Sequence, residues 1–377
     1  MQQPSISGSE RIYSLDVIRG IALLGILLVN MPEYAHLPGM HSGVNAYVRL
    51  FFDLFVQTKF YTIFSFLFGV GFFIFMDRAA ARGERVNVLF SRRLLALFAF
   101  GLFHLFFFWG DILHFYAAVG FFLLAFFPKS ERAVLITALA LLMFSMLPAV
   151  IMEAAGLVWE EQSSQLSAND AGFLYNGLHT IRYVLMSELS SSVQLVPEIL
   201  GLFLLGLYCG KKQVFQRIAD YRSQLQTLRT AGLLLTIPFW IMIVVRFAEN
   251  ESYGMFTAYS WVLFSGKTLA LFYVTSIMLL LERPEWRLRL ASFAAIGKMA
   301  LTTYLTQTLV WAGLDWLLRR WGLTIDLLAG AVLCLLLFAG QIWFARKWLR
   351  HFRFGPAEWL WRLLTYGRRQ PLFQKER

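Results

Sequence analysis

Long apolar runs separated by short polar segments fill almost the whole chain. Runs of about 20 residues with few charges are typical of helices that cross a membrane. The pattern therefore predicts an all-α integral membrane protein with about ten transmembrane helices. The expected spans are 15–32, 56–76, 94–109, 112–128, 133–152, 196–210, 228–246, 256–281, 293–313 and 323–345.

Basic residues are concentrated in every second loop between these runs. Cytoplasmic loops of membrane proteins carry an excess of Lys and Arg, so the alternation predicts an even number of spans with both termini in the cytoplasm. The basic loops hold Arg78, Arg82, Arg85, Arg92 and Arg93; Lys129 and Arg132; Lys211, Lys212, Arg217, Arg222 and Arg229; Arg283, Arg287 and Arg289; and Arg346, Lys347, Arg350 and Arg353.

Composition agrees with a membrane protein. Of the 377 residues, 58% are hydrophobic and only 15% are charged, and the mean hydropathy is +0.59. The net charge of +11 is accounted for by the basic loops, so no nucleic-acid partner is expected. Cys209 and Cys334 lie inside apolar runs, which indicates buried thiols and neither a disulfide framework nor a metal site.

The spans divide the chain into three parts. Residues 1–10 are predicted to be disordered, residues 11–350 to form a polytopic transmembrane domain, and residues 351–377 to form a cytoplasmic interfacial helix and tail. In the last part, Trp359 and Trp361 suit a helix at the headgroup level. The first run has no cleavage site after it and is expected to stay as an anchor.

Two long extracytoplasmic loops are expected, at 33–55 and 153–195. The second contains a partly amphipathic stretch, YNGLHTIRYVLMSEL. This stretch is either an interfacial helix that caps an outward cavity or an ordinary outer loop.

The first apolar run carries a polar stripe. On an α-helix, Asp16, Arg19 and Asn30 fall within about 60° of one another, and Asp16 and Asn30 lie about 21 Å apart along the axis. Because a bilayer core is about 30 Å thick, one helix would present polar groups near both membrane faces on the same side.

Near the outer face, His104 lies in a Phe-rich run, with Asp111 at the following turn and His114 one helical turn later. With Asn30 these residues would form an outward polar pocket, in which Asp111 orients the His104 ring and His104 acts as general base. The alternatives are structural: Asp111 as a helix N-cap, His104 as a satisfied buried histidine, His114 as an interfacial residue and Asn30 as a helix cap or interhelical bond.

Near the cytoplasmic face, Asp16 and Arg19 are spaced to pair, and with Arg92 and Arg93 they would form an anion site. The alternative is an arginine that extends to the headgroups beside its counter-ion. Lys267 lies well inside an apolar run and needs a partner or water. Gly206-x-x-x-Gly210, Gly69 and Gly71 indicate close helix packing.

Several segments together resemble one family. SLDVIRGIALLGILLVN, KFYTIFSFLFGVGF, GLFHLFFFWGDILHFYAAVG, GKMALTTYLTQT and FGPAEWLWRLLTYG, in this order, are similar to the signature segments of YeiB-type bacterial inner-membrane proteins, and the resemblance covers nearly the whole chain. It implies a multi-pass protein of the bacterial inner membrane. Gln307, in the fourth segment, is a further candidate for substrate binding.

The start LDVIRGIA also resembles a wider set, the acyltransferase-3 type enzymes and the heparan-glucosaminide acetyltransferase group. In the first group a His stands where this chain has Asn30. In the second group that position is Asn, and a catalytic His follows in the outer loop, where this chain has His41. The resemblance therefore implies His104 or His41 as the base.

Three functions are compatible with these observations. The leading hypothesis is a transmembrane acyltransferase that moves an acyl group from cytoplasmic acyl-CoA to a hydroxyl or amine acceptor outside, for example on a cell-envelope glycan. No G-x-S-x-G or H-E-x-x-H motif is present, which favours direct transfer over a covalent intermediate. The alternatives are a transporter or channel, with His104, Asp111 and Lys267 as a relay, and an assembly protein. The expected partners are the lipid bilayer, the acceptor and, in a homodimer, a second copy of the chain.

Overall fold

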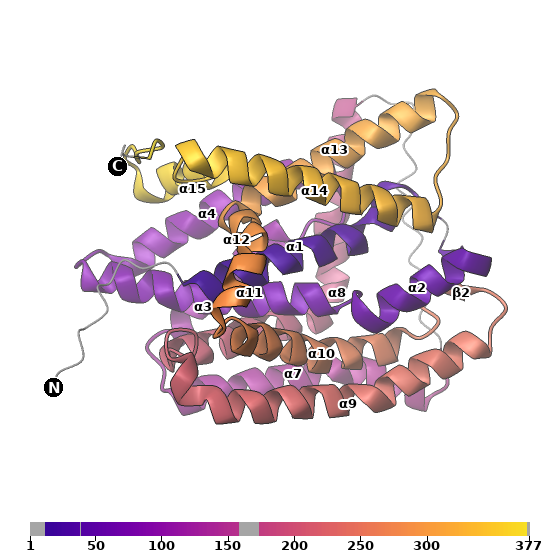
Figure 1. Cartoon of the computed structure of the whole chain (residues 1–377), viewed down its shortest axis with the longest axis horizontal. Helices are drawn as coiled ribbons and strands as arrows, with labels where there is room; N and C mark the ends of the chain where they lie inside the picture. The colour runs from indigo at the N-terminus through magenta and orange to yellow at the C-terminus, as the bar shows by residue number, and fades with distance from the viewer. Residues whose placement is uncertain (1–11, 38, 158–172, 375–377) are drawn as a thin grey trace.

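The structure, a computed structural model, describes residues 12–37, 39–157 and 173–374. This part of the chain is almost entirely helical, and most of the long helices run roughly along one axis (Figure 1). The predicted all-α class is therefore confirmed. The predicted disorder of residues 1–10 lies outside the described residues.

The helices follow one another along the chain and are mostly joined by short turns. They are α1 (Tyr13–Tyr34), α2 (Gly43–Phe55), α3 (Lys59–Ala81), α4 (Val86–Leu105), α5 (Leu113–Gly120), α6 (Phe122–Phe126), α7 (Glu131–Ala154), α8 (Phe173–Lys211), the 3₁₀ turn η1 (Ile218–Tyr221), α9 (Arg222–Ala248), α10 (Tyr259–Leu280), α11 (Pro284–Arg289), α12 (Ala291–Lys298), α13 (Ala300–Arg320), α14 (Leu327–His351) and α15 (Pro356–Tyr366). Two short strands, β1 (Met40–His41) and β2 (Tyr253–Gly254), pair antiparallel.

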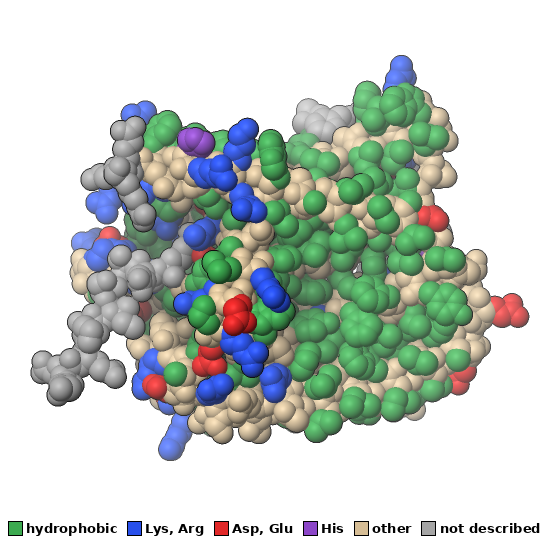
Figure 2. Space-filling view, in the orientation of Figure 1, with side chains coloured by type: hydrophobic (Ala, Val, Ile, Leu, Met, Phe, Trp, Pro, Cys, Tyr) green, Lys and Arg blue, Asp and Glu red, His purple; other side chains and the backbone are tan. Residues whose placement is uncertain are grey.

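Within the described residues, eight helical segments are long and apolar enough to cross a membrane, so the chain is a multi-pass membrane protein. Lys and Arg side chains gather toward the end of the molecule that holds α11 and α15, while hydrophobic side chains cover most of the remaining face (Figure 2). The eight segments are Tyr13–Tyr34, Gly43–Ala81, Val86–Leu105, Glu131–Ala154, Gln194–Lys211, Ile218–Ala248, Tyr259–Leu280 and Leu327–His351.

Both predicted outer loops contain more helix than expected. The loop predicted at 33–55 holds α2, which joins α3 through a kink at Thr58, a residue in the left-handed region with φ of 67°. In the second loop, the amphipathic stretch is helical but forms one continuous helix, α8, with the predicted span 196–210. Residues 158–172 of that loop lie outside the described residues.

The predicted span 293–313 is broken in the structure. α12 ends at Lys298 and α13 begins at Ala300, so the backbone changes direction at Met299. The Glu358 carboxylate of α15 covers the new helix start: it accepts bonds from the backbone N–H groups of Leu301 (2.6 Å) and Thr302 (3.1 Å) and from the Thr302 hydroxyl (2.6 Å). A carboxylate is favourable here because the N–H groups that begin a helix have no partner within it.

The predicted close packing at Gly69 and Gly206 is confirmed, since these residues bring α3 and α8 together. A Cβ added to Gly206 would lie 2.0 Å from the Phe66 carbonyl oxygen, and one added to Gly69 would lie 1.9 Å from that of Phe203. Both neighbours are backbone atoms of the facing helix, so neither can move aside without separating the two helices.

Gly206→Ala is therefore expected to lower the free energy of unfolding by about 1–3 kcal/mol, the usual cost of overpacking a tight contact. The measurement is thermal unfolding of purified protein in detergent. Gly340→Ala is the matched control, because nothing lies within 4 Å of its added Cβ and alanine has the higher helix propensity. Equal stability of the two variants would contradict this account of the α3–α8 contact.

Candidate functional site

A cavity of about 900 Å³ lies between α1, α3, α4, α5, α12, α13 and α15. α1 contributes Asp16, Arg19, Leu23, Ile26 and Asn30 to its wall, spaced three or four residues apart. This is the helical stripe seen in the sequence, and both of its polar ends line the same cavity. The cavity therefore extends along most of α1.

One end of the cavity is strongly basic, and we call it the cationic mouth. Its carboxylates are Asp16, which pairs with Arg19 at 3.4 Å, and Glu358, which caps α13. Arg82 also bonds Glu84, and these hydrogen bonds lower the pKa of that partly exposed carboxyl. The cations that line the mouth are Arg19, Arg78, Arg82, Arg93, Lys298, Arg353 and Arg362. They outnumber the carboxylates, so this end attracts anions.

The structure separates the two arginines that the sequence grouped together. Arg93 lines the cavity, with its guanidinium carbon 3.6 Å from the centre of the Trp361 ring and 5.0 Å from that of Phe75. Arg92 is exposed and is absent from the cavity wall. The two side chains diverge because both residues lie on helix α4, where neighbouring residues point about 100° apart.

Beyond the mouth the walls become apolar, with Leu23, Phe64, Phe68, Leu97 and Leu113 among the lining residues. The far end is polar again and is formed by Asn30, Gly110, Ile112 and Tyr304. We call it the outer end, because Asn30 lies at the opposite end of α1 from Asp16.

Directly behind the outer end lies a buried cluster of His104, Asp111 and His114. One Asp111 oxygen is 2.7 Å from His104 Nδ1, and the other is 2.7 Å from His114 Nδ1 and accepts the His114 backbone N–H at 3.1 Å. All three side chains are buried, with at most 2% of each exposed. Asp111 thus fixes both imidazole rings and also acts as the helix cap that the sequence suggested.

The cluster continues to α13 and α1 through two residues that the sequence analysis did not single out. His104 Nε2 is 2.6 Å from the Thr308 hydroxyl, which in turn lies 2.8 Å from the Tyr34 hydroxyl. The signal in the sequence was the TYLTQT segment, which contains Thr308 but drew attention to Gln307.

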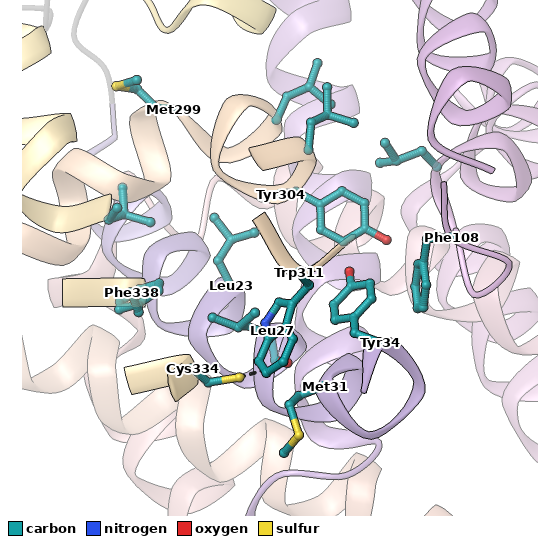
Figure 3. Packing of buried hydrophobic residues seen from close by; sticks show 14 of the residues in the cluster. Leu23, Leu27, Met31, Tyr34, Phe108, Met299, Tyr304, Trp311, Cys334 and Phe338 are labelled. Atoms are coloured by element: carbon teal, nitrogen blue, oxygen red, sulfur yellow. Dashed lines mark hydrogen bonds between the residues drawn. The ribbon is translucent and has the colours of Figure 1, made fainter. Parts of the chain in front are cut away.

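Tyr304 separates the cluster from the cavity. It lines the cavity, and its ring centre is 4.6 Å from that of His104. Figure 3 shows the Tyr304 and Tyr34 hydroxyls turned toward the same space, with the Phe108 ring beside Tyr34 at 4.3 Å. Apolar and aromatic packing therefore holds these polar groups in place.

Three other candidates lie away from the outer end. Gln307 points to α14, where it donates to Gln341 at 3.2 Å. Lys267 pairs with Glu198 at 2.5 Å and donates to the Tyr61 hydroxyl at 3.3 Å, so it reaches the cavity only through Tyr61. His41 pairs in register with Tyr253 in the β1–β2 ribbon and is absent from the cavity wall.

No group of three or more His, Cys, Asp and Glu side chains in the described part of the chain is arranged to hold a metal ion. In the His104–Asp111–His114 cluster, both carboxylate oxygens are already engaged by the Nδ1 atoms of the rings. The arrangement therefore suits proton transfer.

The fold and the cavity define a multi-pass membrane protein with an amphipathic cavity that is cationic at one end. Residues 209–368 match the family model described as "Protein of unknown function (DUF418)". The chain belongs to this family of YeiB-type proteins.

Its relatives match over nearly their whole length. An "Uncharacterized 39.9 kDa protein in amylase 3'region" of Bacillus acidopullulyticus is 34% identical over 98% of both chains. "Uncharacterized protein YxaH" of Bacillus subtilis (strain 168) is 33% identical over 99% of this chain and 98% of its own. "Uncharacterized protein YeiB" of Escherichia coli (strain K12) is 29% identical over 97% and 99%. No solved structure matches the chain.

Proposed function

We propose that this protein is a transmembrane acyltransferase that transfers an acyl group from cytoplasmic acyl-CoA to a hydroxyl or amine acceptor on the extracytoplasmic side. One observation carries the proposal: a single cavity joins the cationic mouth to an outer end that lies against the His104–Asp111 pair. An acyl-CoA has the matching polarity, with phosphates at one end and a thioester on a long, less charged arm.

The donor binds with its phosphates among the arginines of the cationic mouth, since one guanidinium group can donate two parallel hydrogen bonds to a phosphate. Its pantetheine arm and acyl group occupy the apolar middle of the cavity. The thioester carbonyl then faces the outer end, next to Asn30 and Tyr304.

His104 acts as the general base in the transfer. Asp111 accepts a hydrogen bond from His104 Nδ1–H, which leaves Nε2 as the basic nitrogen. The attacking oxygen or nitrogen loses its proton to Nε2 and bonds to the thioester carbonyl carbon. The carbon–sulfur bond then breaks, and the CoA thiolate leaves toward the cytoplasm.

The sidedness of this reaction depends on the topology, for which we propose ten crossings with both termini in the cytoplasm. Eight of these crossings are the long apolar segments. The other two are Leu113–Phe126 and the broken helix α12–α13. The alternation of basic loops supports this arrangement. The membrane is the bacterial inner membrane, the acceptor class is a cell-envelope glycan or small molecule, and a homodimer is compatible with the fold.

Cysteines introduced at Val44 and Glu251 are expected to react with a membrane-impermeant thiol reagent added outside intact cells, whereas those at Asn87 and Ser223 react only after lysis. All four positions are exposed. Cys209 and Cys334 lie within apolar helices and give the background signal of the parent protein. Labelling of Asn87→Cys from outside would show that the chain has the opposite orientation in the membrane. The proposed direction of acyl transfer would then be wrong.

Arg19→Gln is expected to weaken acyl-CoA binding about tenfold, roughly the loss of one charge-assisted hydrogen bond. The loss should shrink as salt is raised, because salt screens accessible charges. Arg92→Gln is the matched control, since Arg92 is exposed and outside the cavity wall. Calorimetric titration with CoA measures both, and equal losses would place the anion elsewhere.

The deciding experiment compares acyl-CoA binding and transfer by purified protein with solute flux in liposomes. A transporter is the second candidate, because the ion pair of buried Glu198 with Lys267 contacts the cavity wall through Tyr61. CoA binding with acyl transfer supports the enzyme. Solute flux without detectable CoA binding would reject the enzyme and support the transporter.

A further inference from the structure

The hydroxyl of Thr308 bonds two side chains from other helices. Threonine hydroxyls inside helices usually bond a carbonyl three or four residues earlier. Thr306 does so with the Thr302 and Thr303 carbonyls, both at 2.9 Å, and Thr236 with the Gly232 carbonyl at 2.7 Å. Thr308 instead bonds two side chains, His104 at 2.6 Å and Tyr34 at 2.8 Å.

The donors in this chain of hydrogen bonds follow from the chemistry of its members. An ionised Asp111 can only accept, so a neutral His104 ring donates from Nδ1 and presents a bare Nε2. The Thr308 hydroxyl then donates to Nε2, and the Tyr34 hydroxyl donates to Thr308 Oγ1. The threonine proton therefore already points at a base.

A hydroxyl bonded to a histidine that is itself held by a carboxylate is the arrangement of an activated nucleophile. Here all three members are buried: counted over the whole residue, backbone included, 1% of Thr308, 2% of His104 and 5% of Asp111 is exposed. They come from α13, α4 and the turn before α5, so the fold assembles them from three separate elements.

We propose that Thr308 is the nucleophile that carries the acyl group between donor and acceptor. This inference rests on the proposed acyltransferase function and replaces the direct attack of the acceptor on the thioester with two successive displacements. In the first step, Thr308 Oγ1 attacks the thioester carbonyl carbon while its proton moves to His104 Nε2. The carbon–sulfur bond breaks, CoA leaves as the thiol with the proton from His104, and the acyl group remains as a threonine ester.

In the second step, the acceptor hydroxyl or amine attacks the ester carbonyl and gives its proton to His104. The bond between the acyl carbon and Thr308 Oγ1 breaks, and His104 returns the proton to the threonine oxygen. The Tyr34 hydroxyl, which donates to that oxygen, stabilises the negative charge that develops there as the bond breaks. Donor and acceptor thus use the same site in turn, from opposite sides of the membrane.

Tyr304 lies between the cavity and the nucleophile. It lies one helical turn before Thr308 on α13 and is the member of the outer end that touches the His104 ring.

The test is to incubate the purified full chain with acetyl-CoA that carries a radiolabelled acetyl group, without acceptor. The expected result is a protein heavier by one acetyl group, with the label mapped to Thr308 by peptide mass spectrometry. The label should resist neutral hydroxylamine, which cleaves thioesters and acyl-imidazoles but leaves oxygen esters intact.

Thr308→Val should lose the label and at least about a hundredfold of the transfer rate while it still binds CoA, and Thr308→Ser should keep both label and transfer. Thr306→Val is the control on the same helix and should be labelled like the parent. Transfer by Thr308→Val at the parental rate, or a label on His104 or a cysteine, would overturn the nucleophile and leave the acyltransferase standing. Absence of CoA binding in the parent would remove both proposals.

Discussion

Replacing His104 with alanine is expected to lower acyl transfer at least about a hundredfold, the lower range of what a positioned general base contributes. The ring hydrogen-bonds both Asp111 and Thr308, at 2.7 and 2.6 Å, so its removal separates the carboxylate from the hydroxyl. CoA binding should be unchanged, because the cationic mouth lies at the other end of the cavity. The measurement is transfer at saturating donor, with CoA binding in parallel.

The control for this prediction is His41→Ala. His41 lies in the β1–β2 ribbon, away from the cavity wall, and its removal should leave transfer near the parental rate. If His41→Ala abolishes transfer and His104→Ala does not, the base lies in the outer segment, as in the resemblance to the acetyltransferase group. If both variants are fully active, histidine base catalysis at either position is wrong.

Lys267→Met is expected to lower the free energy of unfolding by about 3–5 kcal/mol, because it leaves a buried carboxylate without its counter-ion. Glu198 is only 3% exposed and lies inside α8, so little solvent reaches its carboxylate. Tyr61 also donates to Glu198, but one hydroxyl does not neutralise a charge. Thermal and denaturant unfolding in detergent micelles measure the loss.

The double variant Glu198→Gln with Lys267→Met is the control, since it removes both charges together. It should regain most of the lost stability, because an uncharged pair has no large desolvation cost. Acyl transfer by this double variant would show that the pair is structural. A stable double variant that has lost solute flux would instead assign the pair to transport, and a Lys267→Met variant as stable as the parent would contradict the ion pair.

The sequence was sufficient to predict the membrane class and much of the first helix. Apolar runs of spanning length specify helices because the backbone must satisfy its own hydrogen bonds in lipid. The stripe of Asp16, Arg19 and Asn30 follows from helical periodicity alone, and the structure places all three residues on one cavity wall. The contact between His104 and Asp111 could also be predicted from the sequence, since only one turn separates them along the chain.

Contacts between distant segments were beyond the sequence, because helical periodicity gives the face of a residue but not the helix that covers it. Glu198 as the partner of Lys267, and Glu358 as the cap of α13, come from helices far apart in the chain. The break at Met299 was hidden for the same reason: an apolar run looks continuous until a partner such as Glu358 satisfies the N–H groups that the break exposes.

The candidate site also has features that the sequence determines and features that only the tertiary structure determines. Residue types, spacing and loop charge determined that this chain is a multi-pass helical protein with a polar stripe, a basic end and a histidine beside an aspartate. Only the tertiary structure decided that Arg93 and not Arg92 lines the cavity, and that Thr308 of α13 meets His104 of α4 across 204 residues of sequence. The physical reason is that a membrane helix buries its polar groups against whichever neighbour can satisfy them, and packing of the whole bundle selects that neighbour.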